Sequence, residues 1–308
     1  MVSTTFEAGE FWRSVLARAF ALRERAIAFA GAEIVLWKHP LHGRWVSTPY
    51  RDRLAIRWSG DAPVLDLDLL ARAMPGPFLL KDVGPYLGIA PAAENRALRQ
   101  QHTNADVLLD ENIRERLDRS ARKNLRKAGE EYGLVVDTDP VGCFEDFWNC
   151  YLATRRRLGV APYEKRFFGL LFDGLGGPVR LFRCRRDAHT LGYLLCYVHS
   201  DEMISAHIAY DYESRRMRTA DFLFLNAFFW GAANGFRTYR FGGDYNNQTS
   251  LLAAKRKLGA VTRQQYDFEE PVAALDVDDP NALVRRALRL TPMPLFRHAG
   301  LLTRLYFR

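Results

Sequence analysis

Hydrophobic and polar positions in the second half of the chain repeat first with the period of strands and then with that of a helix. Apolar runs at Leu191–Val198 and Met203–Tyr212, joined by a polar turn, predict two paired strands. The apolar stretch that begins near Thr219 and ends at Gly235 predicts a long buried helix. A short strand, Arg237–Phe241, then leads into the glycine turn Gly242-Gly243-Asp244.

This order of elements continues on both sides. A basic helix, Ser250–Leu258, and a last strand, Thr262–Phe268, follow the glycine turn. Two helices and a strand come before the paired strands: Phe144–Leu158, Lys165–Leu175 and Val179–Arg185. One complete α/β unit therefore spans roughly residues 140–270.

The first half of the chain has a similar mixed content. A helix follows Ser3-Thr4-Thr5 and carries Phe11, Val15 and Ala19 at helical spacing. Two or three strands are then expected at Ile34–Lys38, Trp45–Ser47 and Leu54–Trp58. A helix near Leu65–Ala73 and a further strand at Phe78–Lys81 follow them. A helix over 112–131 and a strand at Leu134–Thr138 precede a predicted boundary at Asp139-Pro140.

Composition and charge narrow the class of protein. Hydrophobic residues make up 48% of the 308 positions and charged residues 26%, which is typical of a globular chain. The four cysteines have no CxxC spacing and the start of the chain lacks a secretory signal pattern, so we expect reduced thiols and a cytoplasmic protein. The histidines have no partners at metal-ligand spacing, so no metal site is expected. A net charge of +8 indicates an anionic partner: nucleic acid, a phosphorylated cofactor or a lipid surface.

Basic residues form a stripe on the helix over 112–131. Arg119, Arg122 and Arg126 fall on one helical face with Lys123 beside it, a pattern that suits the phosphates of a tRNA acceptor stem. A solvated surface helix is the alternative. The tail after Asp279 has six arginines and no acidic residue, and it either contacts a membrane surface or packs back on its own domain.

Three motifs carry a resemblance to a known family. They are Ser120–Ala128 with the following Tyr132–Val136, the strand-to-turn sequence Tyr239–Asp244, and the helix ending Lys255–Ala260. With the order of elements they resemble the FemABX-like branch of the GNAT superfamily, most closely over residues 105–268. The resemblance implies an α/β fold (α+β mixed sheets) of two fused GNAT-like acyltransferase domains side by side. These would be residues 1–138, which include the linker helix 112–131, and residues 139–270, followed by a basic helical tail, 271–308.

The resemblance also implies the activity. Such enzymes move an aminoacyl or acyl group from aminoacyl-tRNA or an acyl thioester onto an amine. CoA-using members hold the pyrophosphate on a glycine-rich turn before the central helix, but here Arg218 stands at the glycine position and Asp221 lies in the first helical turn. We therefore favour aminoacyl-tRNA as the donor, with acyl-CoA as the alternative and no tightly bound cofactor. The arginines expected to bind the donor are Arg215, Arg218, Arg122 and Arg126.

The same resemblance suggests catalytic residues. Lys255 matches the family's lysine near the reacting carbonyl and would stabilise the oxyanion. Asp244 and Tyr245 follow the glycine turn, where they would handle the acceptor amine. Alternation on the strand Met203–Tyr212 places Ser205, His207, Ala209 and Asp211 on one face, with His207 a candidate base because its ordinary pKa is near neutrality.

Each of these residues also has a purely structural interpretation. Lys255 would then belong to a basic last helical turn, Asp244 to a turn, and His207 to a packed core. The sequence favours a cytoplasmic amide-forming N-acyltransferase that acts on an amine-bearing small molecule or peptide. A non-catalytic module that binds nucleic acid or a membrane is the rival from another class.

Overall fold

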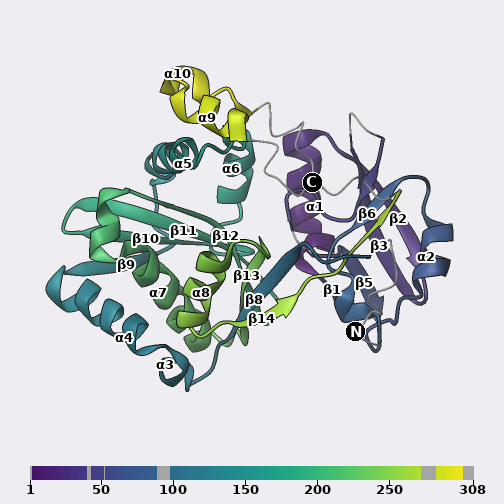
Figure 1. Ribbon diagram of the computed structural model, residues 1–308, viewed down its shortest axis with the longest axis horizontal. Coiled ribbons are helices and arrows are strands. Elements are labelled where there is room, and N and C mark those ends of the chain that lie inside the picture. Colours follow the sequence, from purple (N-terminus) through teal and green to yellow (C-terminus); the bar gives the residue numbers. More distant parts are fainter. Residues whose placement is uncertain (1, 40–42, 52, 89–97, 272–281, 301–308) are drawn as a thin grey trace.

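The computed structural model describes residues 2–39, 43–51, 53–88, 98–271 and 282–300. Within these residues two mixed β-sheets carry helices on their faces (Figure 1). The mixed α/β class expected from the sequence is therefore confirmed. None of the described helices has the length and apolar character that a bilayer crossing needs.

The first sheet is built mainly from the start of the chain. Its strands lie in the order β1 (Val2–Thr4), β5 (Ile56–Ser59), β3 (Ala32–Lys38), β4 (Trp45–Val46), β6 (Phe78–Leu80), β15 (Asp267–Glu270) and β7 (Leu98–Arg99), and β2 (Arg23–Phe29) pairs with β3. Helix α2 (Leu67–Ala73) buries Leu70 in the apolar cluster of this sheet. Asp66 caps that helix by accepting a hydrogen bond from the backbone N–H of Leu69 at 3.0 Å.

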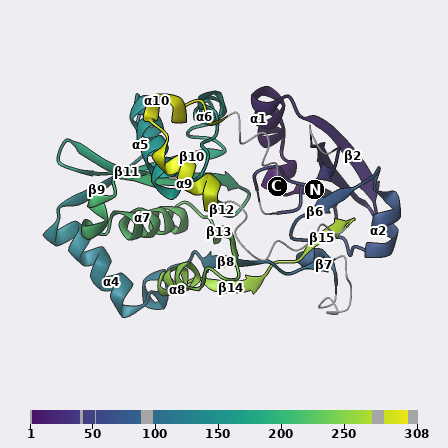
Figure 2. The same ribbon diagram turned by 45° about the horizontal axis from the view of Figure 1, so that its top comes forward.

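The second sheet holds the elements predicted in the second half of the chain. Its order is β14 (Val261–Gln264), β8 (His102–Leu108), β13 (Thr238–Tyr245), β12 (Glu202–Tyr210), β11 (His189–His199), β10 (Val179–Arg186) and β9 (Leu134–Thr138). Helices α5 (Phe144–Leu158) and α6 (Lys165–Phe172) lie on one side of this sheet, and α7 (Thr219–Ala233) lies on the other (Figure 2). The predicted linker helix is divided into α3 (Ile113–Arg116), α4 (Arg119–Arg126) and a π-helical turn, Lys127–Glu131.

Strands β12 and β13 pair over a short distance and then separate. They are parallel neighbours, and their register runs only from Glu202 opposite Thr238 to Ile204 opposite Arg240. Beyond Arg240, β13 continues to pair with β8, whereas β12 stays with β11. The sheet therefore opens between the carboxyl-terminal parts of β12 and β13.

Two predicted details near this opening are wrong. The expected turn Gly242-Gly243-Asp244 is part of β13, which shifts register against β8 between Arg240 and Gly243. The expected last strand Thr262–Phe268 is two strands, because β14 pairs with β8 in the second sheet and β15 pairs with β6 and β7 in the first. The first difference arises because β13 continues to pair with β8, which lacks a clear alternating pattern. The second arises because the chain passes from the second sheet to the first between Gln264 and Asp267.

The two sheets do not divide the chain at residue 138, where the sequence analysis placed the domain boundary. The segment 102–264 supplies every strand of the second sheet, and residues before 100 together with β15 supply the first. The linker helices α3 and α4 therefore lie beside α7, with which α4 packs, rather than with the first sheet.

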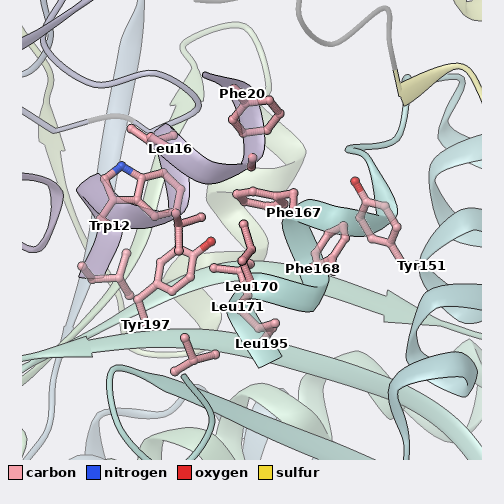
Figure 3. Packing of buried hydrophobic residues seen from close by; sticks show 14 of the residues in the cluster. Trp12, Leu16, Phe20, Tyr151, Phe167, Phe168, Leu170, Leu171, Leu195 and Tyr197 are labelled. Carbon is pink, nitrogen blue, oxygen red and sulfur yellow. The ribbon is translucent and has the colours of Figure 1, made fainter. Parts of the chain in front are cut away.

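An aromatic cluster joins the two sheets. Trp12, fully buried on α1 (Glu10–Phe20), lies 6.0 Å from the ring of Phe167 on α6 and 5.4 Å from that of Tyr197 on β11 (Figure 3). Phe6 stacks on Tyr197 at 4.6 Å. Truncating a large buried aromatic side chain of this kind to alanine costs about 3–5 kcal/mol. This shared apolar cluster therefore holds the two sheets together.

The described part of the tail packs back on α5. Helix α9 (Ala282–Leu290) lies against α5, and the Arg289 guanidinium donates a hydrogen bond to the Leu158 carbonyl at 3.4 Å. Phe296 of α10 (Met293–Phe296) is fully buried in the same cluster as Trp12. Residues 301–308 of the predicted tail lie outside the described residues.

Candidate active site

A small pocket lies where β12 and β13 separate. It has a volume of about 170 Å³, and both parts of the chain line it: Trp12, Tyr50, Arg51, Arg155, Tyr163, Phe167, Tyr197, Ser205, Ala206, His207 and Phe241. We call it the splay pocket. Its walls combine aromatic rings with a few convergent polar groups, which is the composition of a small-molecule site.

His207 lies in the splay pocket among aromatic rings. Its imidazole is 5.0 Å from the ring of Phe168 and 5.7 Å from that of Tyr151. Burial, together with the positive charges of Arg155 and Arg51, holds the pKa of His207 well below its usual value. The imidazole is therefore neutral at pH 7, and its nitrogen lone pair is available to a ligand.

A bulge in β12 changes the predicted pattern of faces. His207 is opposite Leu195 and Ser205 is opposite Cys196, so Ala206 is an extra residue. Ser205 accordingly bonds Tyr239 on the α7 side of the sheet, whereas His207 faces α5 and α6. The prediction that Ser205 and His207 share one face is wrong because strict alternation does not continue through a bulge.

Two arginines bring positive charge to the splay pocket. Arg155 on α5 donates two hydrogen bonds to the Ala161 carbonyl, the shorter at 2.7 Å, and no carboxylate lies within ion-pair distance of it among the described residues. Arg51 reaches in from the first sheet, with its guanidinium 5.0 Å from the centre of the Tyr197 ring and 3.4 Å from the Ser205 carbonyl. Glu7 lies 3.7 Å from Arg51.

Lys255 of helix α8 (Thr249–Lys257) lies beside Asp244 at the end of β13. Their side chains form a close ion pair, and both are largely buried. The Lys255 ammonium also lies 5.0 Å from the centre of the Phe241 ring, which lines the splay pocket. Asp244 is on β13 and His207 is on β12, so the opening between these strands separates the Lys255–Asp244 pair from His207.

The two predicted acceptor-binding residues lie elsewhere. Tyr245 is 47% exposed and its ring packs on His102 at 4.5 Å. Asp211 lies four residues beyond His207, about 13 Å along an extended strand, in a separate cavity of about 580 Å³. There its carboxylate accepts a hydrogen bond from the Glu213 backbone N–H. The structure therefore does not bring Tyr245 and Asp211 together with His207.

The segment before α7 keeps the backbone of an anion-binding turn. Arg218 adopts a left-handed conformation, with φ of 67°, which glycine adopts most readily. No side chain caps α7 at this residue, so the first amides of the helix remain available to an anion. Arg218 and Arg215 are exposed, and the Arg215 guanidinium lies 4.0 Å from the centre of the Tyr212 ring.

A basic groove runs between α4 and α7. It has a volume of about 470 Å³ and is lined by Arg114, Leu117, Arg122, Leu125, Arg126, Gly129, Glu130, Phe222, Asn226 and Phe229. Arg114 stacks over the Phe229 ring at 4.2 Å. Asn124 on α4 donates a hydrogen bond to the Asp221 carboxylate at 2.9 Å, which places the groove beside the first turn of α7.

Sequence reasoning did not single out most of the lining residues, among them three with a polar N–H group. Trp12, Arg51 and Arg155 are far apart along the chain and belong to no motif, and only the packing of the first sheet on α5 and α6 brings them together. In the described part of the chain, no group of three or more metal-ligating side chains is close enough to hold an ion.

The segment 112–248 matches the family model described as an acetyltransferase (GNAT) domain. This segment carries β9 to β13, α5 to α7 and most of the splay pocket. This match to an acetyltransferase domain indicates an acyl-transferring enzyme. No curated protein matches.

Solved structures extend the likeness to both sheets. FemX has a TM-score of 0.61 at 13% identity, with 84% of this chain and 91% of that chain covered. L-PGS from Bacillus licheniformis has a TM-score of 0.55 at 16% identity, covering 96% and 92%. The C-terminal domain of a putative lysylphosphatidylglycerol synthetase from Agrobacterium fabrum has a TM-score of 0.55 at 14% identity, covering 89% of each chain. The predicted FemABX-like form of the GNAT fold is confirmed.

Proposed function

We propose that this protein transfers an aminoacyl group from aminoacyl-tRNA to an amine held in the splay pocket. In this reaction the acceptor nitrogen attacks the ester carbonyl of the donor. A C–N bond forms, the C–O bond to the terminal ribose breaks, and the ribose oxygen leaves with a proton that the amine gives up. The products are an amide and uncharged tRNA.

The observation that carries this proposal is the extent of the basic surface around α7. Arg215 and Arg218 stand before the helix, and the groove with Arg114, Arg122 and Arg126 lies beside its first turn. A single pyrophosphate needs only the helix amides and one or two cations, whereas an RNA stem presents phosphates along its whole length. A surface that continues onto α4 therefore suits RNA better than a compact cofactor.

The likeness to FemX and to lysylphosphatidylglycerol synthetase supports the same choice, because FemABX-like enzymes include users of aminoacyl-tRNA. Lys255 is the proposed oxyanion stabiliser. Its ammonium is fixed by Asp244 and lies next to Phe241, at the opening where a donor carbonyl would enter.

An acyl-CoA donor is the second candidate, and one observation favours it. The left-handed backbone at Arg218 and the uncapped start of α7 preserve a diphosphate-binding turn although glycine is absent. In that case the Arg218 side chain would add positive charge to the turn without blocking the diphosphate from the helix amides.

A binding competition separates the two donors. Charged tRNA and a panel of acyl-CoA thioesters are titrated into the protein, first separately and then against each other, at low and high salt. Salt-sensitive binding of charged tRNA that acyl-CoA does not displace supports the proposal. Saturable binding of acyl-CoA together with no binding of tRNA would favour acyl-CoA as the donor instead.

A further inference from the structure

The splay pocket is positively charged and contains no acid. Arg51 and Arg155 line it, and none of its other lining residues is an aspartate or glutamate. A bare ammonium would be repelled by such a site, because two guanidinium groups face it with no carboxylate in its wall. The pocket therefore selects against a simple cationic amine.

Two hydrogen-bond donors on side chains that line this pocket have no acceptor among the described residues. The indole N–H of Trp12 is fully buried without a partner, and so is the Nε–H of Arg51, whose side chain is 11% exposed. Buried donors of this kind cost roughly 1–3 kcal/mol each unless a ligand or water accepts from them. Of these two side chains, Arg51 carries the positive charge that an anion in the pocket would neutralise.

Glu7 holds Arg51 in place without using up its donors. The nearest carboxylate oxygen of Glu7 lies 3.7 Å from Arg51 Nε, beyond hydrogen-bond distance. Burial raises the pKa of Glu7, which further weakens the ion pair between its carboxylate and the Arg51 guanidinium. Apart from one long hydrogen bond of 3.4 Å from an Nη to the Ser205 carbonyl, the fork of Arg51 is open to a planar anion such as a carboxylate.

We propose that the acceptor is a small amine that also carries a carboxylate, with the dimensions of an amino acid, and that Arg51 and Arg155 bind its carboxylate. His207 accepts a hydrogen bond from the amino group and points it toward the opening between β12 and β13. A volume of about 170 Å³ suits a molecule of this size and is smaller than the roughly 300 Å³ at which sites for drug-sized ligands begin. The role of this ligand as acceptor rests on the proposed function. Its binding to the pocket does not, since binding requires no donor.

The test is a binding experiment without any donor. The common α-amino acids and their neutral α-carboxamides are titrated into the full chain, with the fluorescence of Trp12 and calorimetry as readouts. A Trp12→Phe variant identifies the part of the signal that comes from the pocket. The proposal predicts saturable binding of at least one amino acid and binding of its amide weaker by about tenfold or more.

Arg51→Gln should weaken binding of the amino acid by about tenfold or more and leave binding of the amide unchanged. Arg51→Lys, which keeps the charge but loses the planar fork, should lie between Arg51→Gln and the wild type. Arg166→Gln removes an exposed arginine from the outer side of α6 and serves as the matched control, with no change expected. Thermal unfolding verifies that each variant is folded.

Equal affinity for amino acid and amide would overturn the proposal. So would an absence of saturable binding for every amino acid, or equal losses in Arg51→Gln and Arg166→Gln. If amino acids bind as predicted and no donor yields an amide, the pocket assignment stands and the proposed transfer fails.

Discussion

Lys255 and Asp244 form a buried ion pair at the point where β13 has separated from β12. The Lys255 ammonium contacts the carboxylate on one side and lies 5.0 Å from the centre of the Phe241 ring on the other. Each residue therefore fixes the other. The Asp244 carboxylate is ion-paired with Lys255, and the orientation of Lys255 depends on Asp244.

This pair should be strongly coupled in stability. Lys255→Met leaves the Asp244 carboxylate buried without a counter-charge, and Asp244→Asn does the same to the ammonium. Each single change should lower the free energy of unfolding by about 3 kcal/mol, as measured by urea denaturation. The double variant should lose much less than the sum of the two. Additive losses would show that the two side chains do not interact in solution.

The groove between α4 and α7 should carry RNA binding. Reversing charge in it, with Arg122→Glu and Arg126→Glu, should weaken tRNA binding and reduce the dependence of log K on log salt by about one unit per lost phosphate contact. Arg119→Glu changes an exposed arginine of α4 that does not line the groove, and it makes the matched control. Filter binding at several salt concentrations measures both. Equal effects of all three changes would point to non-specific attraction.

His207 should make the fold sensitive to acid. The pKa of His207 is lowered in the folded state, whereas in the unfolded chain it is about 6.5. Between these two pKa values the unfolded chain therefore binds more protons than the native one. The stability that neutral His207 contributes is thus complete above the unfolded pKa and is lost as pH falls below it. The Tm should drop between pH 7 and 5, and His207→Gln should flatten that drop. His189→Gln, at an exposed histidine, should not alter the drop. An unchanged pH profile in His207→Gln would exclude this titration.

Two helical glycines should respond to alanine in opposite directions. A Cβ at Gly231 of α7 would lie 2.4 Å from the Met203 sulfur and 2.8 Å from a Leu109 methyl carbon, so Gly231→Ala should destabilise by about 1–3 kcal/mol. A Cβ at Gly169 of α6 meets nothing within 4 Å, so Gly169→Ala should stabilise by about 0.5–1 kcal/mol. Chemical denaturation compares the two. The same sign of change in both variants would contradict the packing described for α7.

Helices and strands could be predicted from the sequence where the pattern of hydrophobic and polar residues is regular over the whole element. Helix α7 is apolar around its whole circumference and α5 has a clear buried face, so both were found close to their observed bounds. Strand β2 was missed because its side chains are mostly exposed and alternate weakly, and β8 because its polar residues interrupt the pattern. The pairing of β8 with β13 and β14 is a long-range property that no local pattern contains.

The candidate site shows the same division. Lys255 and Asp244 could be found from their motifs and do lie together, and His207 could be found as a lone histidine on a strand. Arg51 and Arg155 could not, since their significance comes from the docking of the first sheet against α5. Arg218 could be seen to replace a glycine, but its left-handed backbone could not be inferred, because most side chains disfavour that conformation.

The most direct test of the proposed function is an amide-formation assay. The protein is incubated with tRNA carrying a radiolabelled amino acid, or with labelled acyl-CoA, and with the amino acid that binds the splay pocket best. We predict a labelled product from charged tRNA that survives mild alkali, which cleaves the tRNA ester but not an amide, and no product from acyl-CoA. Thiol release from acyl-CoA with transfer to the amine, and no product from charged tRNA, would contradict the account.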